Sequence, residues 1–330
     1  MASPKVLLLG NIVYAHKAWN ALSKDFGVVT TSATNRPEFI QECKSGKFSG
    51  VVAIYRTSPS TSITGLIDKE LVEALPDTVK FVSHNGAGYD QVDVAACTQR
   101  SIQVSNTPSA VDDATADTAV FLMIGALRRF NEPMLSLRSG SWLGNSQPGH
   151  DPQKKVLGIV GFGGIGKTIA RRAKAFDMKV QYYSRNRVAD EEGCSYVSLN
   201  KLLETSDVVS LSVPLNEHTK HMISYPEFEK MKPGVVIINT ARGPVVDEDA
   251  LVKALERGKV GSAGLDVFEE EPKVHPGLLN NPKVILLPHV GTFTVETRQK
   301  MEEWALDNVR QAVEKGTLKS RVPEQANLTF

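Results

Sequence analysis

A short apolar strand runs directly into a glycine-rich turn near the middle of this chain, and this feature constrains the fold most. The segment VLGIV is followed by Gly161-Phe162-Gly163-Gly164-Ile165-Gly166 and then by the helix-forming segment TIARRAKAF. A G-x-G-x-x-G turn between a strand and a helix is typical of βαβ units that bind a pyrophosphate at the helix N-terminus. The pattern predicts a parallel α/β sheet with a dinucleotide-binding site at these six residues.

Short apolar runs separated by helix-compatible stretches recur along the whole chain. Four lie in the first third and six follow residue 155: Val6–Leu9, Val51–Ile54, Phe81–Val82, Ile102–Val104, Val156–Val160, Val180–Tyr183, Val208–Val213, Val235–Asn239, Gly261–Val267 and Val284–Leu287. Such runs are typical of parallel strands that helices cover on both faces. We therefore expect an α/β protein with two doubly wound parallel sheets, the second with six strands.

Two helical segments suggest where the domains meet. A chain of 330 residues is long enough for two separate cores. The apolar segment 113–129 opens with acids and ends with bases, as the helix dipole prefers, and we expect it to bridge two domains. We infer that the amphipathic segment 294–315 returns to the first domain. The prediction is a discontinuous substrate domain of residues 1–112 and 292–330, and a dinucleotide-binding domain of residues 113–291.

Charge and cysteine usage argue against several classes of protein. The 38 Lys and Arg residues balance 37 Asp and Glu residues, so the net charge of +1 favours neither nucleic acid nor an anionic membrane surface. Three cysteines without CxxC spacing argue against a disulfide framework and a zinc site. The N-terminal apolar run is too short for a signal peptide or a membrane span. We expect a cytoplasmic protein without a metal.

The segment after the second strand of the nucleotide-binding unit predicts which dinucleotide binds. NAD sites usually carry an acid about twenty residues beyond the turn, which holds the ribose 2′-hydroxyl. This chain has Ser184-Arg185-Asn186-Arg187 there, and Asp190 and Glu191 lie too far along. Hydroxyl, amide and guanidinium groups can bind a 2′-phosphate. We predict NADPH, contacted by Ser184, Arg185 and Asn186, with NADH as the alternative; otherwise Arg185 and Arg187 are solvated loop residues.

Polar residues follow three predicted strands of the C-terminal half, in the segments 239–243, 264–272 and 287–291. Open α/β sheets bind ligands beyond the carboxyl ends of their strands. Reduction of a 2-keto acid needs a cation for the carboxylate and carbonyl, and a proton donor that titrates near neutrality. These segments contain Arg242, Glu271 and His289, which offer a cation, a carboxylate and an imidazole of this kind.

The chain resembles the D-isomer-specific 2-hydroxyacid dehydrogenase family over nearly its whole length. The resemblance rests on the glycine-rich turn, the loop NGAGYD, the segment Asn106-Thr107-Pro108, the stretch TARGPVVDEDALVKALERGKVGSAGLDVFEEEP and the final histidine. It implies that Arg242 binds the substrate carboxylate and carbonyl, that His289 exchanges the proton, and that Glu271 orients His289 and stabilises its charged form. It also implies a flavodoxin-like substrate domain, a Rossmann dinucleotide-binding domain, a cleft between them, and a homodimer.

The resemblance extends to further contacts. It implies that Ala87 and Gly88 present backbone N–H groups to the substrate carboxylate, and that the cofactor is contacted by Val213, Pro214, Thr219, Thr240, Ala241, Arg242, Asp266, Gly291 and, more weakly, Thr115. Tyr55, Arg56 and the region around Trp142, which packs at the dimer interface in the family, would shape the pocket. An inward Arg56 would suit a polar substrate tail, and an outward one would suit phenylglyoxylate or branched keto acids.

Differences from related enzymes reduce the number of candidate activities. Formate dehydrogenases of the superfamily carry Gln where this chain has Glu271, and phosphoglycerate dehydrogenases use NAD. Glyoxylate or hydroxypyruvate reductases and broader D-2-hydroxyacid or D-mandelate dehydrogenases remain. The non-enzyme alternative is a dinucleotide-sensing scaffold, similar to the transcriptional corepressors that resemble this family.

Overall fold

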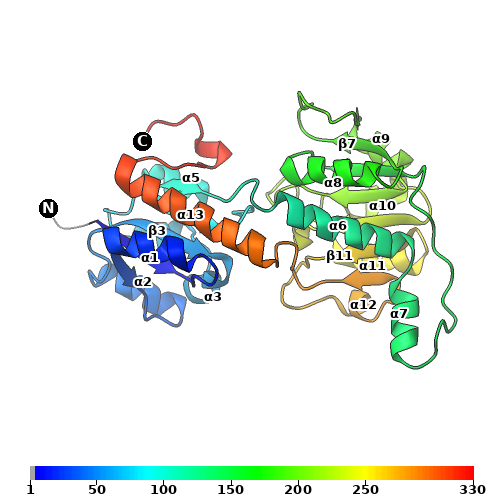
Figure 1. The fold of residues 1–330 in the computed structure, drawn as a ribbon, viewed down its shortest axis with the longest axis horizontal. Helices are drawn as coiled ribbons and strands as arrows, with labels where there is room; N and C mark the ends of the chain where they lie inside the picture. Colours follow the sequence, from blue (N-terminus) through cyan, green and yellow to red (C-terminus); the bar gives the residue numbers. More distant parts are fainter. Residues whose placement is uncertain (1–3) are drawn as a thin grey trace. The chain divides into compact units, whose positions relative to one another are not determined.

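The protein consists of two compact α/β units, each with its own parallel sheet. The computed structural model describes residues 4–330, so residues 1–3 of the predicted first domain lie outside the described residues. Unit 1 comprises the described residues up to Val111 together with Thr294–Phe330, and unit 2 comprises Asp112–Phe293. Figure 1 shows helices on both faces of each sheet. The doubly wound α/β class is as predicted.

Unit 1 contains a five-stranded sheet with the order β2-β1-β3-β4-β5. Its elements are β1 (Lys5–Leu9), α1 (His16–Asp25), β2 (Gly27–Thr30), α2 (Arg36–Lys44), β3 (Val51–Thr57), η1 (Ser58–Ser60), α3 (Thr61–Thr64), α4 (Lys69–Ala74), β4 (Phe81–Asn85), α5 (Val94–Gln99), β5 (Gln103–Ser105), α13 (Val295–Lys315) and η3 (Pro323–Gln325). The sequence prediction missed β2, because this edge strand is half exposed and offers only two consecutive apolar residues.

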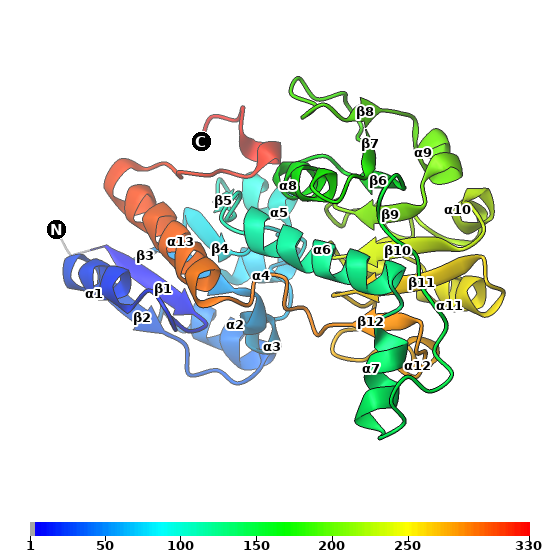
Figure 2. The same cartoon turned by 45° about the vertical axis from the view of Figure 1, so that its right-hand side comes forward.

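The long helix α13 completes the core of unit 1. It lies across β3 and β4 (Figure 2), where Ala305, Leu306 and Val309 are buried. The buried carboxylate of Glu302 accepts hydrogen bonds from the backbone N–H groups of residues 13, 14 and 15, at 2.7–3.0 Å for the shortest contact of each. The C-terminal helix therefore also fixes the segment that leads into α1.

Unit 2 contains a seven-stranded sheet with the order β12-β11-β10-β9-β6-β7-β8. Its elements are α6 (Asp112–Leu127), α7 (Asn131–Arg138), β6 (Val156–Val160), α8 (Gly164–Lys174), β7 (Lys179–Tyr183), β8 (Ser195–Tyr196), α9 (Leu199–Thr205), β9 (Val208–Leu211), α10 (Tyr225–Lys230), β10 (Val235–Asn239), η2 (Gly243–Val245), α11 (Glu248–Glu256), β11 (Val260–Leu265), α12 (Pro276–Leu279) and β12 (Val284–Leu286).

One prediction for this unit was wrong. The sheet has seven strands instead of six, because the two residues of β8 are exposed and form no apolar run. The apolar helix α6 lies in unit 2. Its buried residues pack on β10 and β11, and a side chain at Gly264 would approach the Cβ of Leu122 to 2.7 Å. Helix α6 is therefore a core element of the nucleotide-binding sheet.

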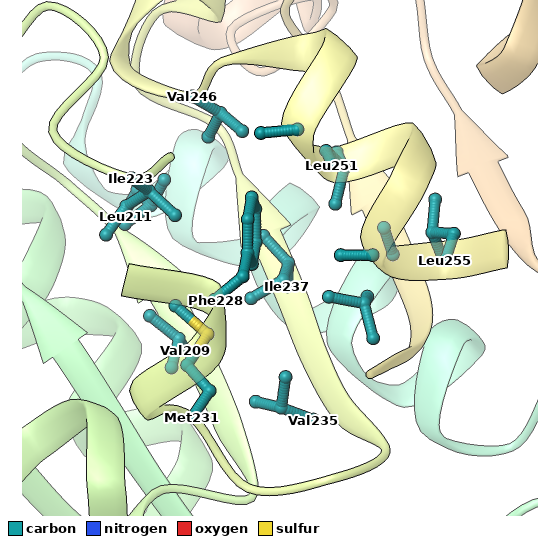
Figure 3. Close-up of a cluster of buried hydrophobic side chains, with 14 of the residues drawn as sticks. Val209, Leu211, Ile223, Phe228, Met231, Val235, Ile237, Val246, Leu251 and Leu255 are labelled. Atoms are coloured by element: carbon teal, nitrogen blue, oxygen red, sulfur yellow. The ribbon is translucent and has the colours of Figure 1, made fainter. Parts of the chain in front are cut away.

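The core of unit 2 explains why β10 is apolar over four consecutive residues. On one face, Val235 and Ile237 of β10 pack with Phe228 and Leu251, which lie on α10 and α11 (Figure 3). On the other face, Ile238 packs in the cluster that includes residues of α6 and α8. Successive side chains of a strand point to opposite faces, so a strand buried on both faces must be continuously apolar.

Three further findings bear on the expected function classes. Within residues 4–330, no helix is long and apolar enough to cross a membrane. In that same part of the chain, no group of three or more His, Cys, Asp or Glu residues is arranged to hold a metal ion. Cys43, Cys97 and Cys194 are buried free thiols.

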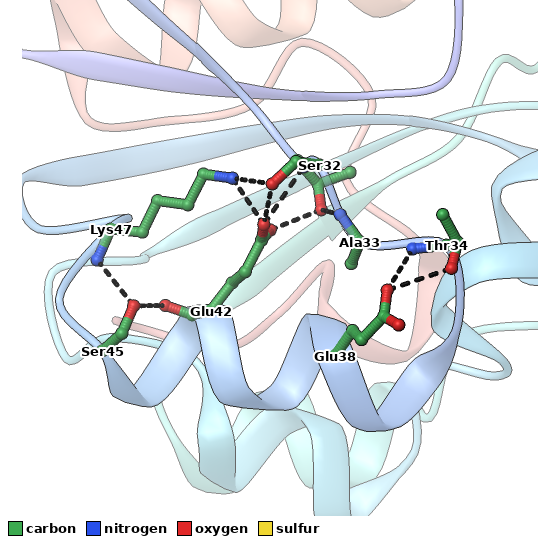
Figure 4. A network of polar contacts seen from close by, with 8 residues as sticks. Ser32, Ala33, Thr34, Glu38, Glu42, Ser45 and Lys47 are labelled. Carbon is green, nitrogen blue, oxygen red and sulfur yellow. Dashed lines mark hydrogen bonds and ion pairs between the residues drawn. The ribbon is translucent and has the colours of Figure 1, made fainter.

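A polar network joins α2 to the segment that follows β2 (Figure 4). The Glu42 carboxylate accepts hydrogen bonds from Thr31 Oγ1, from the N–H and Oγ of Ser32, and from Lys47 Nζ. Burial alone would raise the pKa of Glu42, but the hydrogen bonds from Lys47, Ser32 and Thr31 lower it to about 2. Its side chain is only 15% exposed, so the ionised form is held in place by these donors.

We expect Glu42→Gln to lower the free energy of unfolding at neutral pH by about 1–2 kcal/mol. The folded pKa of Glu42 lies below the ordinary value of 4.5, so its stabilisation is complete above that value and is lost as the pH falls toward 2. Urea unfolding at neutral pH and at about pH 3 should show the difference from the wild type shrinking in acid. Glu73→Gln is the control, since Glu73 is 62% exposed. An equal difference at both pH values would contradict this prediction.

Candidate active site

The glycine-rich turn connects β6 to α8, and its backbone requires glycine at two positions. Gly161 has φ +95°, and a Cβ there would lie 2.4 Å from the carbonyl oxygen of Ser212. A Cβ at Gly166 would lie 2.3 Å from the carbonyl oxygen of Gly161. A Cβ at Gly163, by contrast, would meet nothing within 4 Å. The backbone at Gly163 is therefore open to a ligand such as a pyrophosphate, beside the first turn of α8.

The other residues of the turn contribute through their backbone. The Phe162 ring is buried and stacks on Tyr182 with ring centroids 4.0 Å apart, and Ile165 packs against the same core cluster. A Cβ at Gly164 would lie 2.0 Å from Oδ2 of Asp112, so the turn also packs against the start of α6. Burial, reinforced by the charge of Asp113, raises the pKa of Asp112. The side chains of Phe162 and Ile165 therefore pack into unit 2.

The segment after β7 contains an ion pair that the sequence did not indicate. Ser184 Oγ donates to the carbonyl of Asn186 at 2.6 Å, and Arg185 is exposed. Arg187 donates through Nε and Nη2 to the two carboxylate oxygens of Glu191, both at 2.8 Å. The hydrogen bond from Arg187, followed by that from the Tyr182 hydroxyl, lowers the pKa of Glu191 to about 2. Glu191 therefore holds Arg187 instead of taking the place of the missing ribose-binding acid.

Val213, Pro214 and Thr219 lie in the loop that follows β9. Thr219 Oγ1 donates to the carbonyl of Pro214 at 2.6 Å and accepts from the N–H of Asn216 at 2.9 Å. The Thr219 hydroxyl therefore closes its own loop. Thr115 lies buried in α6, and a Cβ at Gly291 would be 3.6 Å from its methyl group. The structure thus brings Thr115 and Gly291 together within unit 2.

The loop after β10 carries Arg242 and is shaped by the buried amide of Asn239. Asn239 Oδ1 accepts from the N–H of Ala241 at 3.0 Å, and Nδ2 donates to the carbonyl of Arg242 at 2.9 Å. Arg242 is half-buried, and its Nη1 donates to the carbonyl of Ala241 at 2.8 Å. Thr240 Oγ1 is buried without a hydrogen-bond partner in the described part of the chain, which fits a contact to a bound group. Sequence reasoning gave Asn239 no role, although an amide ending an apolar strand was a usable signal.

The Arg242 loop packs directly against the segment that leads to Glu271. A Cβ at Gly243 would lie 1.9 Å from the carbonyl carbon of Phe268, so only glycine fits there. The backbone N–H of Glu248 donates to Glu269 Oε2 at 3.1 Å, and the N–H of Glu269 donates to Glu248 Oε1 at 2.9 Å. His221 Nε2 also contacts the Glu269 carboxylate. These bonds fix the segment on which Glu271 stands.

The imidazole of His289 is held by a carboxylate from the neighbouring loop. His289 Nδ1 lies 2.8 Å from Glu271 Oε2, and Glu271 Oε1 accepts from the N–H of Phe268 at 3.0 Å. His289 has φ +55°, and its N–H donates to the carbonyl of Asp266 at 2.7 Å. The buried Asp266 carboxylate accepts from the N–H groups of Val290 and Gly291 at 2.7 and 2.8 Å. Asp266 therefore fixes the backbone that presents the imidazole.

The charges in this site favour an ionised Glu271. Burial alone would raise the pKa of Glu271, but hydrogen bonds from His289 and the Phe268 N–H, with the charges of His289 and Arg242, hold it below its ordinary value. Burial raises the pKa of Asp266 despite its two backbone donors. An ionised carboxylate on Nδ1 leaves Nε2 as the ring nitrogen that can exchange a proton with a ligand.

The loop after β4 in unit 1 presents two backbone N–H groups. The Thr107 N–H donates to the carbonyl of Gly86 at 2.9 Å. Asn106 Nδ2 donates to the carbonyl of Ala87 at 2.7 Å. Among the described residues, no backbone carbonyl accepts a hydrogen bond from the N–H of Ala87 or Gly88. Two neighbouring donors of this kind suit a carboxylate. The loop therefore fits the expected role of Ala87 and Gly88.

Tyr55 and Arg56, which the family resemblance places near the substrate pocket, lie on β3 of unit 1. Both side chains are fully buried inside unit 1, because β3 is an interior strand between β1 and β4. The Tyr55 hydroxyl accepts from Asn85 Nδ2 at 2.9 Å. The guanidinium of Arg56 lies beside His84 and Gln91. Trp142 follows α7 and is 79% exposed.

Comparisons with known proteins identify the family of this chain. The model of the D-isomer specific 2-hydroxyacid dehydrogenase NAD binding domain matches residues 120–291. The 4-methyl-2-oxopentanoate reductase A of Aspergillus oryzae is 53% identical over 327 residues, which span 98% of this chain and 99% of that protein.

Two solved structures share the whole fold. A glyoxylate reductase from Paecilomyes thermophila has a TM-score of 0.97 and 53% identity, over 98% of this chain and 100% of that chain. An NADPH-dependent glyoxylate/hydroxypyruvate reductase from Sinorhizobium meliloti, in complex with NADP and malonate, has a TM-score of 0.85 and 31% identity, over 98% of each chain. These findings confirm the resemblance seen in the sequence. The chain belongs to the D-isomer specific 2-hydroxyacid dehydrogenase family and is an NAD(P)-dependent oxidoreductase.

Proposed function

We propose that this enzyme reduces a small 2-keto acid to the D-2-hydroxy acid and prefers NADPH. The observation that carries the proposal is the 2.8 Å contact between His289 Nδ1 and Glu271. This pair stands with Arg242 on loops after β10, β11 and β12, three adjacent strands of the sheet that also carries the glycine-rich turn. An acid–base imidazole and a guanidinium at one sheet edge are what carbonyl reduction beside a carboxylate requires.

Each unit has a separate task in this proposal. Unit 2 holds the dinucleotide through residues 161–166 and through Thr115, Val213, Pro214, Thr219, Thr240, Ala241, Arg242, Asp266 and Gly291. The bound nicotinamide supplies the hydride. Unit 1 contributes the N–H groups of Ala87 and Gly88, which bind the substrate carboxylate.

Arg242 and His289 act on the reacting group. The planar guanidinium of Arg242 binds the carboxylate and the carbonyl oxygen, where negative charge develops during reduction. His289 Nε2 donates the proton to that oxygen, while Glu271 stabilises the imidazolium through Nδ1. In the reverse direction the same nitrogen accepts the proton from the hydroxyl group.

The preference for NADPH rests on the segment after β7. Ser184, Arg185 and Asn186 offer donors to a 2′-phosphate, and a carboxylate that would repel this group is absent from these three positions. Arg187 donates to the Glu191 carboxylate through Nε and Nη2, so the N–H groups of its Nη1 can still donate to an anion. The relative from Sinorhizobium meliloti, whose name states NADPH dependence, supports this choice.

Two further properties complete the proposal. We propose a homodimer, because α7 and the loop after it expose the apolar side chains of Met134, Leu135, Leu137, Trp142 and Leu143. Clustered apolar side chains of this kind are typical of protein interfaces. We also propose that the enzyme works in the cytoplasm, where its three free thiols would stay reduced.

Steady-state reduction of glyoxylate, hydroxypyruvate, phenylglyoxylate and 2-ketoisocaproate, each with NADPH and with NADH, tests the function and the cofactor together. We expect turnover of at least one keto acid, with kcat/KM about tenfold or more higher with NADPH, since charge-assisted hydrogen bonds to the 2′-phosphate are lost with NADH. Equal or better use of NADH would refute the cofactor preference alone. Tight dinucleotide binding without turnover of any substrate would refute the reductase and favour the scaffold.

A further inference from the structure

A buried arginine lies next to the loop of Ala87 and Gly88. Arg56 is fully buried, and burial lowers its pKa to about 10 despite the opposing charge of Asp90, so it stays a cation at neutral pH. Its Nη2 donates to Gln91 Oε1 at 2.9 Å, and its Nη1 lies 3.2 Å from His84 Nδ1. Its Nε has no hydrogen-bond partner in the described part of the chain. Burying a guanidinium is costly, so this arrangement calls for a functional reason.

The register of the sheet places Arg56 and His84 side by side. The two residues are paired across the parallel strands β3 and β4, so their side chains point to the same face. A guanidinium has hydrogen-bond donors only, and His84 Nδ1 must therefore accept from Arg56. The hydrogen of a neutral imidazole then resides on Nε2, which lies 2.9 Å from the carbonyl oxygen of Gly88 and donates to it. Arg56 thus fixes the tautomer of His84, and His84 fixes Gly88.

The loop runs directly over the His84 ring. A Cβ at Gly86 would lie 2.6 Å from His84 Nε2, so a side chain there would displace the imidazole or the loop. Three successive carbonyls of the loop therefore accept hydrogen bonds from other parts of unit 1. His84 donates to Gly88, Asn106 donates to Ala87, and the Thr107 N–H donates to Gly86.

Tied carbonyls also orient the N–H groups. In a trans peptide, the C=O of one residue and the N–H of the next point in opposite directions. The Gly86 carbonyl points toward the Thr107 N–H, so the Ala87 N–H of the same peptide points away from Thr107. The Ala87 carbonyl points toward Asn106, so the Gly88 N–H points away from Asn106. His84 anchors the far side of Gly88 and prevents this peptide pair from rotating.

We propose that Arg56 and His84 are positioning residues for keto-acid reduction, which hold the Ala87 and Gly88 N–H groups in the geometry that binds the substrate carboxylate. The pair acts through the loop and never touches the substrate. This inference rests on the proposed function, because it assigns the carboxylate to that loop.

His84→Asn and His84→Gln separate the two contacts of the imidazole. An asparagine amide can approach the position of Nδ1 and face Arg56, but it is too short to reach Gly88. A glutamine amide can reach the position of Nε2 and donate to Gly88. We expect His84→Asn to raise KM for the keto acid about tenfold to a hundredfold, and His84→Gln to restore most of this loss.

The control and the readouts distinguish positioning from a general loss of structure. Ser83→Ala removes a buried hydrogen bond of 2.8 Å to the carbonyl of Ala305, one residue earlier on β4 and away from the loop. It should lower Tm without changing KM for the keto acid. The Kd for NADPH, followed by its fluorescence, should change less than twofold in every variant, because the dinucleotide is assigned to unit 2.

An unchanged KM for the keto acid in His84→Asn would overturn the inference. The proposed function would still hold in that case, provided that the wild type turns over the keto acid. Equal rises of KM for the keto acid and of Kd for NADPH would also overturn it. Absence of turnover in the wild type would instead overturn the proposed function. Should His84→Asn fail to fold, Arg56→Lys answers the same question, since lysine keeps the charge but cannot bridge His84 and Gln91 at once.

Discussion

Replacing His289 with glutamine should lower kcat for keto-acid reduction by about a hundredfold to ten-thousandfold, with a much smaller change in KM. His289 Nδ1 is held by Glu271 at 2.8 Å, so Nε2 is the proposed source of the proton that the carbonyl oxygen receives. Glutamine keeps a polar group near the substrate but cannot give up a proton at neutral pH. The substrate would still bind, while protonation would depend on water.

A second histidine of unit 2 provides the matched control. His275 Nε2 lies 3.1 Å from Asp249 Oδ1 at the surface, outside the loops that carry the three candidate catalytic residues. His275→Gln should leave kcat and KM unchanged. Single-turnover measurements at saturating NADPH would establish whether the chemical step is the one that slows. A kcat for His289→Gln within twofold of the wild type would refute the assignment of the proton to His289.

Replacing Arg242 with methionine should lower kcat/KM for the keto acid by about a thousandfold to ten-thousandfold. Arg242 is proposed to contact both the carboxylate and the carbonyl oxygen, so its loss should raise KM and lower kcat together. Arg242→Lys should recover only part of the loss, because lysine carries the charge without the planar fork.

Arg257→Met serves as the control for removing a guanidinium. Arg257 is the C-cap residue of α11, is 59% exposed at its side chain and pairs with Glu229 at 3.6 Å. Neither variant should change Tm by more than a few degrees, and NADPH binding should persist in both. If Arg242→Met raised KM alone and left kcat intact, Arg242 would bind the carboxylate but would not stabilise the carbonyl oxygen.

Burial explains how much of the fold the sequence predicted. Strands such as β10 are covered on both faces, so that residues 235–238 form an unbroken apolar run. The missed strands β2 and β8 lie at the edges of their sheets, where exposed backbone can pair without an apolar signature. Helix α6 was predicted within two residues of its ends, because it is apolar over most of its length and packs against β10 and β11.

The candidate site divides along a similar line. Residues within a compact motif, such as the six of the glycine-rich turn, were identified because their neighbours in sequence are also their neighbours in space. The sequence did not reveal that Arg187 pairs with Glu191 or that Arg56 contacts His84, for different reasons. Glu191 is only four residues from Arg187, but its pairing depends on how the chain turns after β7. His84 lies next to Arg56 only because β3 and β4 pair in one particular register.

The discontinuity of unit 1 has a consequence for the order in which a ribosome completes this protein. Unit 2 is one continuous segment and can bury its core as soon as Phe293 has emerged. Unit 1 is begun first, yet Ala305 and Val309 of α13 pack against Val6 and Tyr55 in one cluster. The apolar surface of β1 and β3 therefore stays exposed until α13 has left the ribosome. Over that interval the N-terminal segment is the part of the nascent chain most exposed to aggregation and most in need of a chaperone.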